Sequence, residues 1–194
     1  MAWDTEATRR KLLAAATEEF AAHGFAGARV DRIAAQAGVN KQRIYSYFGD
    51  KDGLFEAVLG DGLAELFETI PLEGEGPDAV AEHAAAMFDF FGGRPGLARL
   101  LCWEGLERAG SPAAAALRTR GCGGKIEAMR RVLPGASRQD AADLVLSVTT
   151  LVVGWHGLSQ LDMLMAGDLP RTHALRRASV AAAARGMAGA VAGA

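Results

Sequence analysis

The chain has 194 residues, of which 50% are hydrophobic and 23% are charged, and its formal net charge is −2. This length is enough for one medium domain or two small domains with a substantial hydrophobic core. The near-neutral charge excludes a globally basic nucleic-acid coat and a polybasic membrane peptide, so any contact with DNA has to be confined to one region of the chain.

The first residues and the cysteines indicate the compartment. The N-terminal segment mixes charges early and lacks a basic stretch followed by an apolar run, so it does not resemble an export signal. Two cysteines, Cys102 and Cys122, are too few for a disulfide framework. We therefore expect a cytoplasmic protein with reduced thiols, and a single bridge is the alternative. The longest uncharged stretch, residues 144–161, contains several polar side chains, so we expect a buried helix and no membrane contact.

Apolar residues recur at helical spacing along the chain, and no segment alternates as a strand would. Gly and Pro residues separate the helical segments and outline about nine helices, so the predicted fold class is all-α. The helices before about residue 48 are short and closely spaced, whereas the later ones are long and rich in Ala. We predict one domain over residues 1–50 and a larger one over residues 51–194.

Residues 30–48 have the pattern of a helix-turn-helix. A short helix ends near Gly38, because a helix end in the left-handed conformation favours Gly, and a second one begins at Lys41 with Asn40 as its N-cap. Further caps are expected at Asp31, Asp50 and Ser137. The second helix of such a motif enters the major groove of DNA. Its predicted exposed side chains, which suit base edges and phosphates, are Lys41, Gln42, Arg43, Tyr45, Ser46 and Tyr47.

The same segment resembles a known family. Ile33-Ala34, Ala37-Gly38-Val39-Asn40, Ile44-Tyr45, Tyr47-Phe48 and the run from Asp50 to Phe55 are similar to the N-terminal signature of the tetracycline-repressor-like (TetR) transcriptional regulators. The resemblance is specific over residues 10–60, and beyond them the chain matches mainly in length and helical layout. It implies an all-helical homodimer that binds double-stranded DNA through a three-helix headpiece. A fourth helix would link this headpiece to a larger domain that senses a small-molecule effector.

The resemblance also assigns roles by position. Lys41, Gln42, Arg43 and Tyr45 become candidates for base contacts, with Ser46 on the same exposed face, and Tyr47 and Lys51 become candidates for phosphate contacts. The Thr that is usual before the second helix of the headpiece is absent, and Arg29 would replace its phosphate contact through charge. The alternatives are that Lys41, Arg43 and Lys51 are solvated surface residues and that Tyr45 packs within the headpiece.

Aromatic and Met residues accumulate after Gly53, and the resemblance implies that helices of this region enclose a mostly apolar pocket. Such pockets combine apolar walls with a few polar groups that orient the ligand. The alternative is that these residues are plain core, and for His156 that it is a hydrogen-bonded core histidine. The candidate ligand contacts are Phe88, Phe91, Trp103, Glu104, Met129, Trp155 and His156.

The last two long helices, about residues 138–166 and 172–191, are the expected dimerisation elements. Leu151, Leu158 and Leu161 supply apolar area, and a dimer with two-fold symmetry predicts an inverted-repeat operator. The alternative is a monomer that packs these faces internally. Small residues that would let helices approach closely are Ala178, Ala181, Ala182, Gly186, Gly189 and Ala190.

No enzyme, metal or cofactor site is predicted. Residues 121–126 resemble a phosphate loop, but Thr119 stands where its first Gly is required and Ile126 where Ser or Thr is required. The four His residues lack zinc-ligand spacing. The predicted function is a transcriptional repressor that an apolar or aromatic effector releases from its operator. The alternative is a helical ligand-binding or protein-interaction module without sequence-specific DNA binding, because residues 1–60 carry eight basic and eight acidic side chains.

Overall fold

The computed structural model describes residues 5–108, 110, 112–166, 169 and 172–193, and these form ten helices without any strand. The all-α prediction is confirmed, with one helix more than the expected nine. The helices are α1 (Thr5–Gly27), α2 (Val30–Ala37), α3 (Lys41–Phe48), α4 (Lys51–Thr69), α5 (Gly76–Gly92), α6 (Pro95–Glu107), α7 (Ala115–Val132), α8 (Arg138–Gly157), α9 (Ser159–Ala166) and α10 (His173–Ala192).

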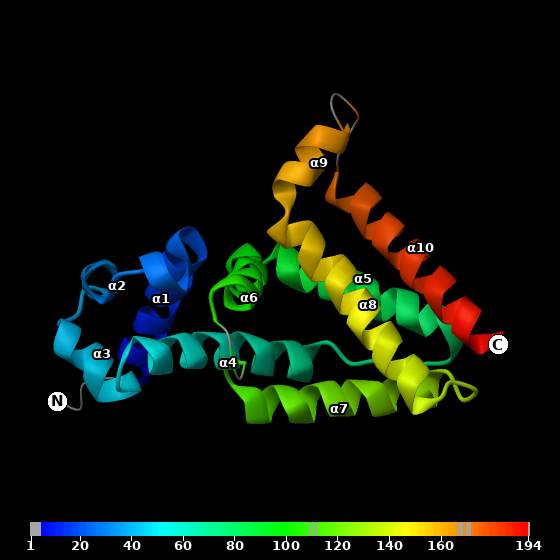
Figure 1. Cartoon of the computed structure of the whole chain (residues 1–194), viewed down its shortest axis with the longest axis horizontal. Helices are drawn as coiled ribbons and strands as arrows, with labels where there is room; N and C mark the ends of the chain where they lie inside the picture. The colour runs from blue at the N-terminus through cyan, green and yellow to red at the C-terminus, as the bar shows by residue number, and fades with distance from the viewer. Residues whose placement is uncertain (1–4, 109, 111, 167–168, 170–171, 194) are drawn as a thin grey trace.

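The helices form two connected parts, which we call the headpiece (α1–α3) and the body (α5–α10). Helix α4 begins beside the headpiece and runs into the body, where α7 lies along it (Figure 1). Helices α5, α8 and α10 pack together at the far end, and α6 packs against α1. The short helix α9 projects from this arrangement (Figure 1). None of the described helices combines the length and apolar composition that crossing a membrane requires.

Polar side chains begin several helices as the sequence predicts. The Asn40 side chain accepts a hydrogen bond from the Gln42 backbone N–H at 2.9 Å, and the Asp50 side chain accepts one from Gly53 at 2.7 Å. Ser137 and Asp140 form a reciprocal capping box at the start of α8. The predicted cap at Asp31 is wrong, because α2 begins at Val30 after Arg29 and the Asp31 carboxylate binds Lys41 instead.

The segment expected as one helix over residues 138–166 is divided at Leu158. Gly154 and Gly157 weaken the last turn of α8, and the backbone of Leu158 leaves the helical conformation before α9 begins. The expectation of a buried helix over residues 144–161 is also only half right. Leu144, Val148 and Val152 face the core, whereas 65% of Leu146 is exposed to solvent.

One hydrophobic core extends through both parts of the chain by way of α4. On the headpiece side, the ring of Phe55 packs edge-on against Phe20 and Phe25, with ring centres 5.1 and 5.3 Å apart. Further along the same helix, Leu63 and Leu66 are buried within the body. A displacement of α4 therefore has to move both the headpiece and the body.

Candidate DNA-binding surface and body cavity

The turn between α2 and α3 follows directly from Gly38. Its backbone is left-handed (φ 67°, ψ 33°), and its N–H and that of Val39 satisfy carbonyls of the last turn of α2. Ile33 and Ile44 are completely buried between the two helices, and Ala34 is nearly so. This packing fixes the direction in which α3 presents its outer face, as a helix-turn-helix requires.

The outer face of α3 carries the side chains that the sequence analysis selected. Lys41, Gln42, Arg43, Tyr45 and Ser46 are all exposed, and 46% of Tyr45 is accessible to solvent. Tyr47 is different, because its ring is half-buried against the headpiece core and lies 6.0 Å from the ring of Phe48. Five of the six positions therefore form a solvent-exposed polar surface on one short helix.

Lys41 is held by an acidic neighbour on α2. Its ammonium lies 2.8 Å from the Asp31 carboxylate. The hydrogen bond between them, together with their charges, raises the pKa of Lys41 and lowers the pKa of Asp31. Any anion that binds Lys41 therefore has to compete with Asp31.

The flanking basic residues also have contacts within the protein. The Lys51 ammonium donates to the Ala26 carbonyl oxygen at 3.3 Å and lies 4.9 Å from the centre of the Phe25 ring. Arg29 is exposed, and it precedes α2 without a side-chain cap. These contacts place Lys51 at the junction of α1 and α4.

A buried carboxylate organises the start of α2, and the sequence analysis did not identify it. Glu19 is only 6% exposed and accepts hydrogen bonds from the Arg29 backbone N–H at 2.8 Å and from Arg32 Nε at 2.7 Å. Burial alone would raise the pKa of Glu19, but the hydrogen bonds from Arg32 and Arg29 lower it below its ordinary value. Arg32 thus holds α2 against α1. The two residues are 13 positions apart in the chain, and no local sequence pattern indicates that they pair.

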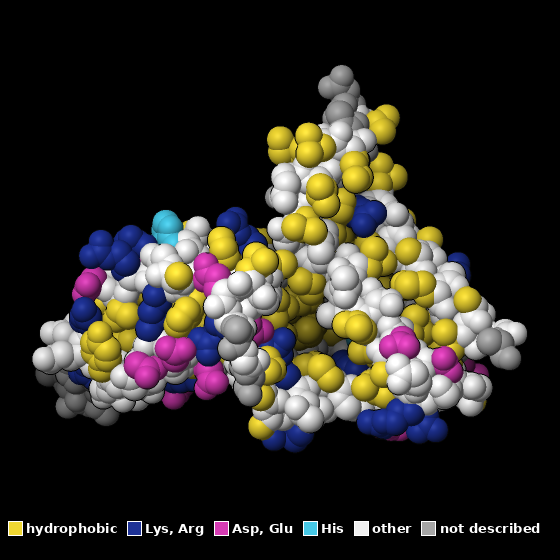
Figure 2. All heavy atoms as spheres, in the orientation of Figure 1, with side chains coloured by type: hydrophobic (Ala, Val, Ile, Leu, Met, Phe, Trp, Pro, Cys, Tyr) yellow, Lys and Arg dark blue, Asp and Glu magenta, His cyan; other side chains and the backbone are white. Residues whose placement is uncertain are grey.

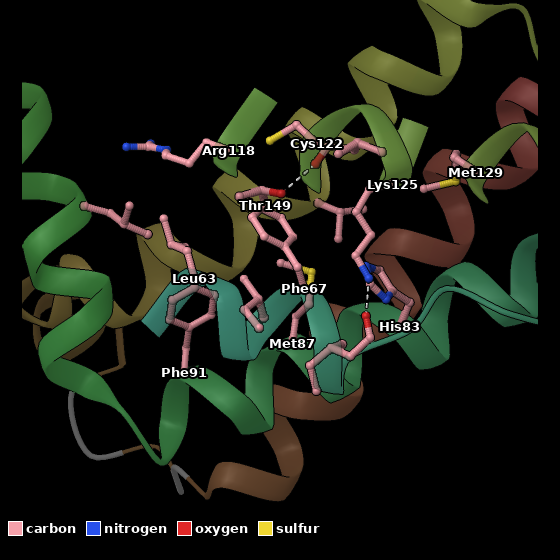
Figure 3. A pocket seen from close by; sticks show the side chains of 15 residues that line it. Leu63, Phe67, His83, Met87, Phe91, Arg118, Cys122, Lys125, Met129 and Thr149 are labelled. Carbon is pink, nitrogen blue, oxygen red and sulfur yellow. Dashed lines mark hydrogen bonds between the residues drawn. The ribbon is translucent and has the colours of Figure 1, made fainter. Parts of the chain in front are cut away.

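The body contains a cavity of about 120 Å³ between α4, α5, α6, α7 and α8 (Figure 3). Its wall is mostly apolar. Helix α7 contributes both polar and apolar side chains, Arg118, Cys122, Lys125 and Met129, which lie on one face of the helix. Their spacing of four, three and four residues is a signal that the sequence analysis could have used. The lining residues are Leu63, Leu66, Phe67, Ile70, His83, Met87, Phe91, Leu101, Arg118, Cys122, Lys125, Met129, Val145, Val148 and Thr149.

Of the seven predicted ligand contacts, Phe91 and Met129 line this cavity and the other five do not. Phe88 packs on His156, with ring centres 4.8 Å apart, and on Trp155 at 6.4 Å. The Nε2 of His156 donates to the Phe88 carbonyl oxygen at 3.2 Å, and burial lowers the pKa of His156. This is the hydrogen-bonded histidine of the alternative interpretation.

Trp103 and Glu104 hold α6 in place. The Trp103 indole donates to the Ala21 carbonyl oxygen of α1 at 3.4 Å. The Glu104 carboxylate, 6% exposed, accepts from the Ala113 backbone N–H at 2.6 Å and from Arg118 at 2.5 Å. Both residues lie outside the lining of the cavity, because Trp103 faces α1 and Glu104 faces Ala113 and Arg118.

The end of α6 fastens the body to the headpiece. Glu107 accepts a hydrogen bond from the Ala26 backbone N–H at 2.9 Å. Arg108 pairs with Asp52 of α4 at 2.6 Å and lies over the rings of Phe25 and Phe55, at 4.8 and 5.2 Å from their centres. Since Leu101 on the same helix lines the cavity, α6 connects the cavity wall directly to the headpiece.

Apolar side chains gather on the outside of the body, over α9 and the start of α10 (Figure 2). The small residues that the sequence analysis noted on α10 are exposed or half-buried, while Val180, Ala184 and Ala188 form the face that is buried. A large exposed apolar area on a folded protein marks an interaction surface. The exposed large apolar residues of this part of the chain are Leu146, Leu158, Leu161, Met163, Leu164, Met165, Leu169 and Leu175.

The structure has a helix-turn-helix headpiece that one helix joins to an all-helical body with an internal cavity. This arrangement is that of a class of bacterial regulatory proteins, and comparison with known families identifies the class. Residues 12–58 match the family model described as bacterial regulatory proteins, tetR family. Residues 79–186 match the family model of the tetracyclin repressor-like C-terminal domain. The chain therefore belongs to the TetR family, as the resemblance of its N-terminal segment indicated.

Individual relatives agree with this assignment. The HTH-type transcriptional repressor SCO4008 of Streptomyces coelicolor is 45% identical over 104 residues, which cover 54% of this chain and 53% of that protein. The HTH-type transcriptional repressor NicS of Pseudomonas putida is 32% identical over 111 residues, covering 55% and 52%. The chain thus spans about half the length of the curated relatives it matches.

Solved structures match over more of the chain. SCO4942 of Streptomyces coelicolor is 33% identical, with a TM-score of 0.77, and the match covers 93% of this chain and 97% of that chain. A TetR-like transcriptional regulator from Rhodococcus sp. RHA1 has a TM-score of 0.66 at 19% identity, covering 94% and 93%. This second likeness concerns the fold alone.

Proposed function

We propose that the protein is a transcriptional repressor that binds an inverted-repeat operator as a homodimer and releases it when a small apolar or aromatic effector occupies the body cavity. The observation that carries this proposal is the outer face of α3, where five polar side chains are exposed to solvent on a helix fixed by Gly38, Asn40 and the buried Ile44. Curated relatives named as transcriptional repressors support the same function. A protein that acts on bacterial DNA works in the cytoplasm, the location expected from the sequence.

In this proposal, residues 1–50 bind DNA and residues 51–194 bind the effector and the second protomer. Gln42, Arg43 and Tyr45 read base edges, with Lys41 and Ser46 beside them, because these side chains occupy the exposed face of α3. Lys41 exchanges Asp31 for DNA on binding. Arg29, Tyr47 and Lys51 contact phosphates at the edge of this surface, which fixes the register of α3 on the duplex.

The proposed dimer forms through α8 and α10. Their exposed faces combine large apolar side chains such as Leu146 and Leu175 with the small residues of α10. Burying this area against a second copy removes it from water and generates the two-fold symmetry that an inverted repeat requires. The two α3 helices then have to lie about 34–36 Å apart, or at a multiple of that distance, to enter successive major grooves.

Effector binding reaches the headpiece through α6 and α4. The cavity is lined by Leu101 of α6 and by Leu63 of α4, and both helices also contact the headpiece, α6 through Glu107 and Arg108. An effector that binds the released arrangement more tightly than the DNA-bound arrangement shifts the population toward release. A small displacement of either helix changes the spacing of the two α3 helices.

The decisive experiment is selection from a random double-stranded DNA library near physiological salt, followed by sequencing of the retained DNA. We expect an inverted repeat whose bases change when Arg43 is replaced by Ala. Arg120→Ala is the matched control, because Arg120 is exposed on α7 far along the chain from α3, and it should retain the wild-type repeat. Recovery of no repeat, with only weak and salt-sensitive binding, would refute sequence-specific regulation and favour a ligand-binding or protein-interaction module.

A further inference from the structure

The charges around the body cavity define what it is able to hold. Apart from apolar side chains, the described lining residues include Thr149, Cys122, His83 and two basic residues, Arg118 and Lys125, and none of them is acidic. A charged ligand is therefore attracted or repelled according to whether these two cations already have partners.

Arg118 already has a partner. Its guanidinium donates to Glu104 at 2.5 Å, and Glu104 is itself nearly buried and bonded to the Ala113 backbone. In Figure 3 the guanidinium of Arg118 points away from the other labelled residues of the cavity. The opposite charges of Arg118 and Glu104 cancel, so this end of the cavity is neutral.

Lys125 has no carboxylate partner among the described residues. Lys125 is half-buried, and its ammonium donates one hydrogen bond to the Ile70 carbonyl oxygen, which leaves two N–H groups without an acceptor in the described part of the chain. Burial lowers the pKa of Lys125, as expected for a cation without a counter-charge. Lys125 and His83 lie side by side at one end of the cavity (Figure 3).

His83 does not add to this charge at neutral pH. It is buried, and its ring Nδ1 lies 2.9 Å from the Pro71 carbonyl oxygen. Burial lowers the pKa of His83 to about 4, so the ring is neutral at pH 7. Among the described lining residues, Lys125 alone carries a charge without a charged partner, at one end of a mostly apolar chamber.

We propose that the effector is a small amphipathic anion, a carboxylate whose apolar body fills the cavity and whose charged group binds Lys125. The cavity of about 120 Å³ is close to the roughly 150 Å³ that holds a benzene ring, so the apolar body is about one aromatic ring or a short alkyl chain. Phe67, Met87 and Phe91 form the wall against which this body lies. The inference rests on the proposed role of the cavity as the effector site.

The position of Lys125 also gives this anion a route to the headpiece. The Ile70 carbonyl oxygen that Lys125 binds follows the last turn of α4, so Lys125 of α7 tethers the carboxyl end of α4. A carboxylate that accepts from the two remaining N–H groups pulls the ammonium toward the cavity and weakens its bond to this carbonyl, because a charge-assisted hydrogen bond to a carboxylate is stronger than one to a neutral carbonyl. The weaker Ile70 contact loosens the end of α4, the helix whose other end adjoins α3.

The test is isothermal titration calorimetry with three probes of equal ring size, namely benzoate, benzyl alcohol and benzylamine. We expect wild-type protein to bind benzoate about tenfold more tightly than benzyl alcohol and to bind benzylamine least, because a charge-assisted hydrogen bond contributes about this factor. Lys125→Met should remove the preference for benzoate but retain the affinity for benzyl alcohol. Lys125→Arg should keep the preference, and the control Lys11→Met, on the exposed side of α1, should behave as wild type.

Two results would overturn the proposal. One is equal or tighter binding of benzyl alcohol or benzylamine by the wild type, and the other is a benzoate preference that persists in a folded Lys125→Met variant. Thermal unfolding of each variant establishes that it is folded, and Lys125→Arg separates loss of charge from loss of the Ile70 contact. If the protein selects an operator but shows no preference for benzoate, the anion site is refuted and the repressor function stands. If the protein prefers benzoate but selects no operator, the repressor function is refuted and the anion site stands.

Discussion

Replacing Gly24 by Ala perturbs the place where α1 meets the end of α6. The backbone of Gly24 has φ 70° and ψ 178°, a conformation that is accessible to Gly and strained for other residues. A Cβ atom added at this position would lie 2.6 Å from Glu107 Oε1. The Glu107 side chain would have to move, and it would lose its hydrogen bond to the Ala26 backbone N–H.

The expected loss of stability follows from these two effects. The strained backbone costs about 1–3 kcal/mol for a residue other than Gly. The hydrogen bond lies at the surface, so its loss adds about 1 kcal/mol. Gly24→Ala should therefore lower the free energy of unfolding by about 2–4 kcal/mol in total.

Urea denaturation followed by circular dichroism measures this free energy. The matched control is Gly105→Ala, since Gly105 lies inside α6 with open space around it, and Ala there should raise stability by about 0.5–1 kcal/mol. In the presence of Glu107→Ala, the added cost of Gly24→Ala should shrink to the backbone strain alone. A Gly24→Ala variant within about 0.5 kcal/mol of the wild type, the range of ordinary surface substitutions, would refute the reasoning.

Three further predictions concern DNA binding and pH. Arg43→Ala should change the preferred bases, and identical base preferences in this variant would exclude Arg43 from base readout. Lys51→Ala should weaken binding to all DNA sequences alike and lower the slope of log affinity against log salt concentration by about one. Competition binding at several salt concentrations would measure both effects. Asp31→Ala should tighten DNA binding because it frees Lys41, and unchanged affinity would exclude that competition. The pKa of His83 is lowered from 6.5 to about 4, so the unfolded chain binds this proton first as the pH falls. Stability should therefore be complete above pH 6.5 and decline between 6.5 and about 4, and denaturation of His83→Gln should show a shallower decline.

The sequence predicted the headpiece in detail because its signals are local. The turn at Gly38 and the cap at Asn40 depend on residues within about one helical turn, and Ile33 and Ile44 are buried within the same short motif; the structure has each of these features. The pairing of Arg32 with Glu19 was missed, since it joins two helices and depends on their crossing.

The cavity was harder to predict than the headpiece. Helical spacing indicates that Trp103, Trp155 and His156 have a buried side, but it does not say which neighbour each side meets. In the structure these residues meet other helices instead of the cavity. The cavity depends instead on how α4, α5 and α7 are placed around it, and that placement is a property of the whole fold.

The continuity of α4 limits how such a regulator can be rebuilt from parts. Leu54, Phe55 and Leu59 of this helix complete the core beside α1, while Leu63 and Leu66 belong to the body. A chimera that joined residues 1–50 to the body of a relative would take its Phe55 equivalent from a foreign helix and leave Phe20 and Phe25 against an unmatched surface. Exchange of DNA specificity between relatives therefore requires that α4 be transferred together with the headpiece. The residues at the end of α6 that contact α1 and α4 then have to be adapted to the new headpiece.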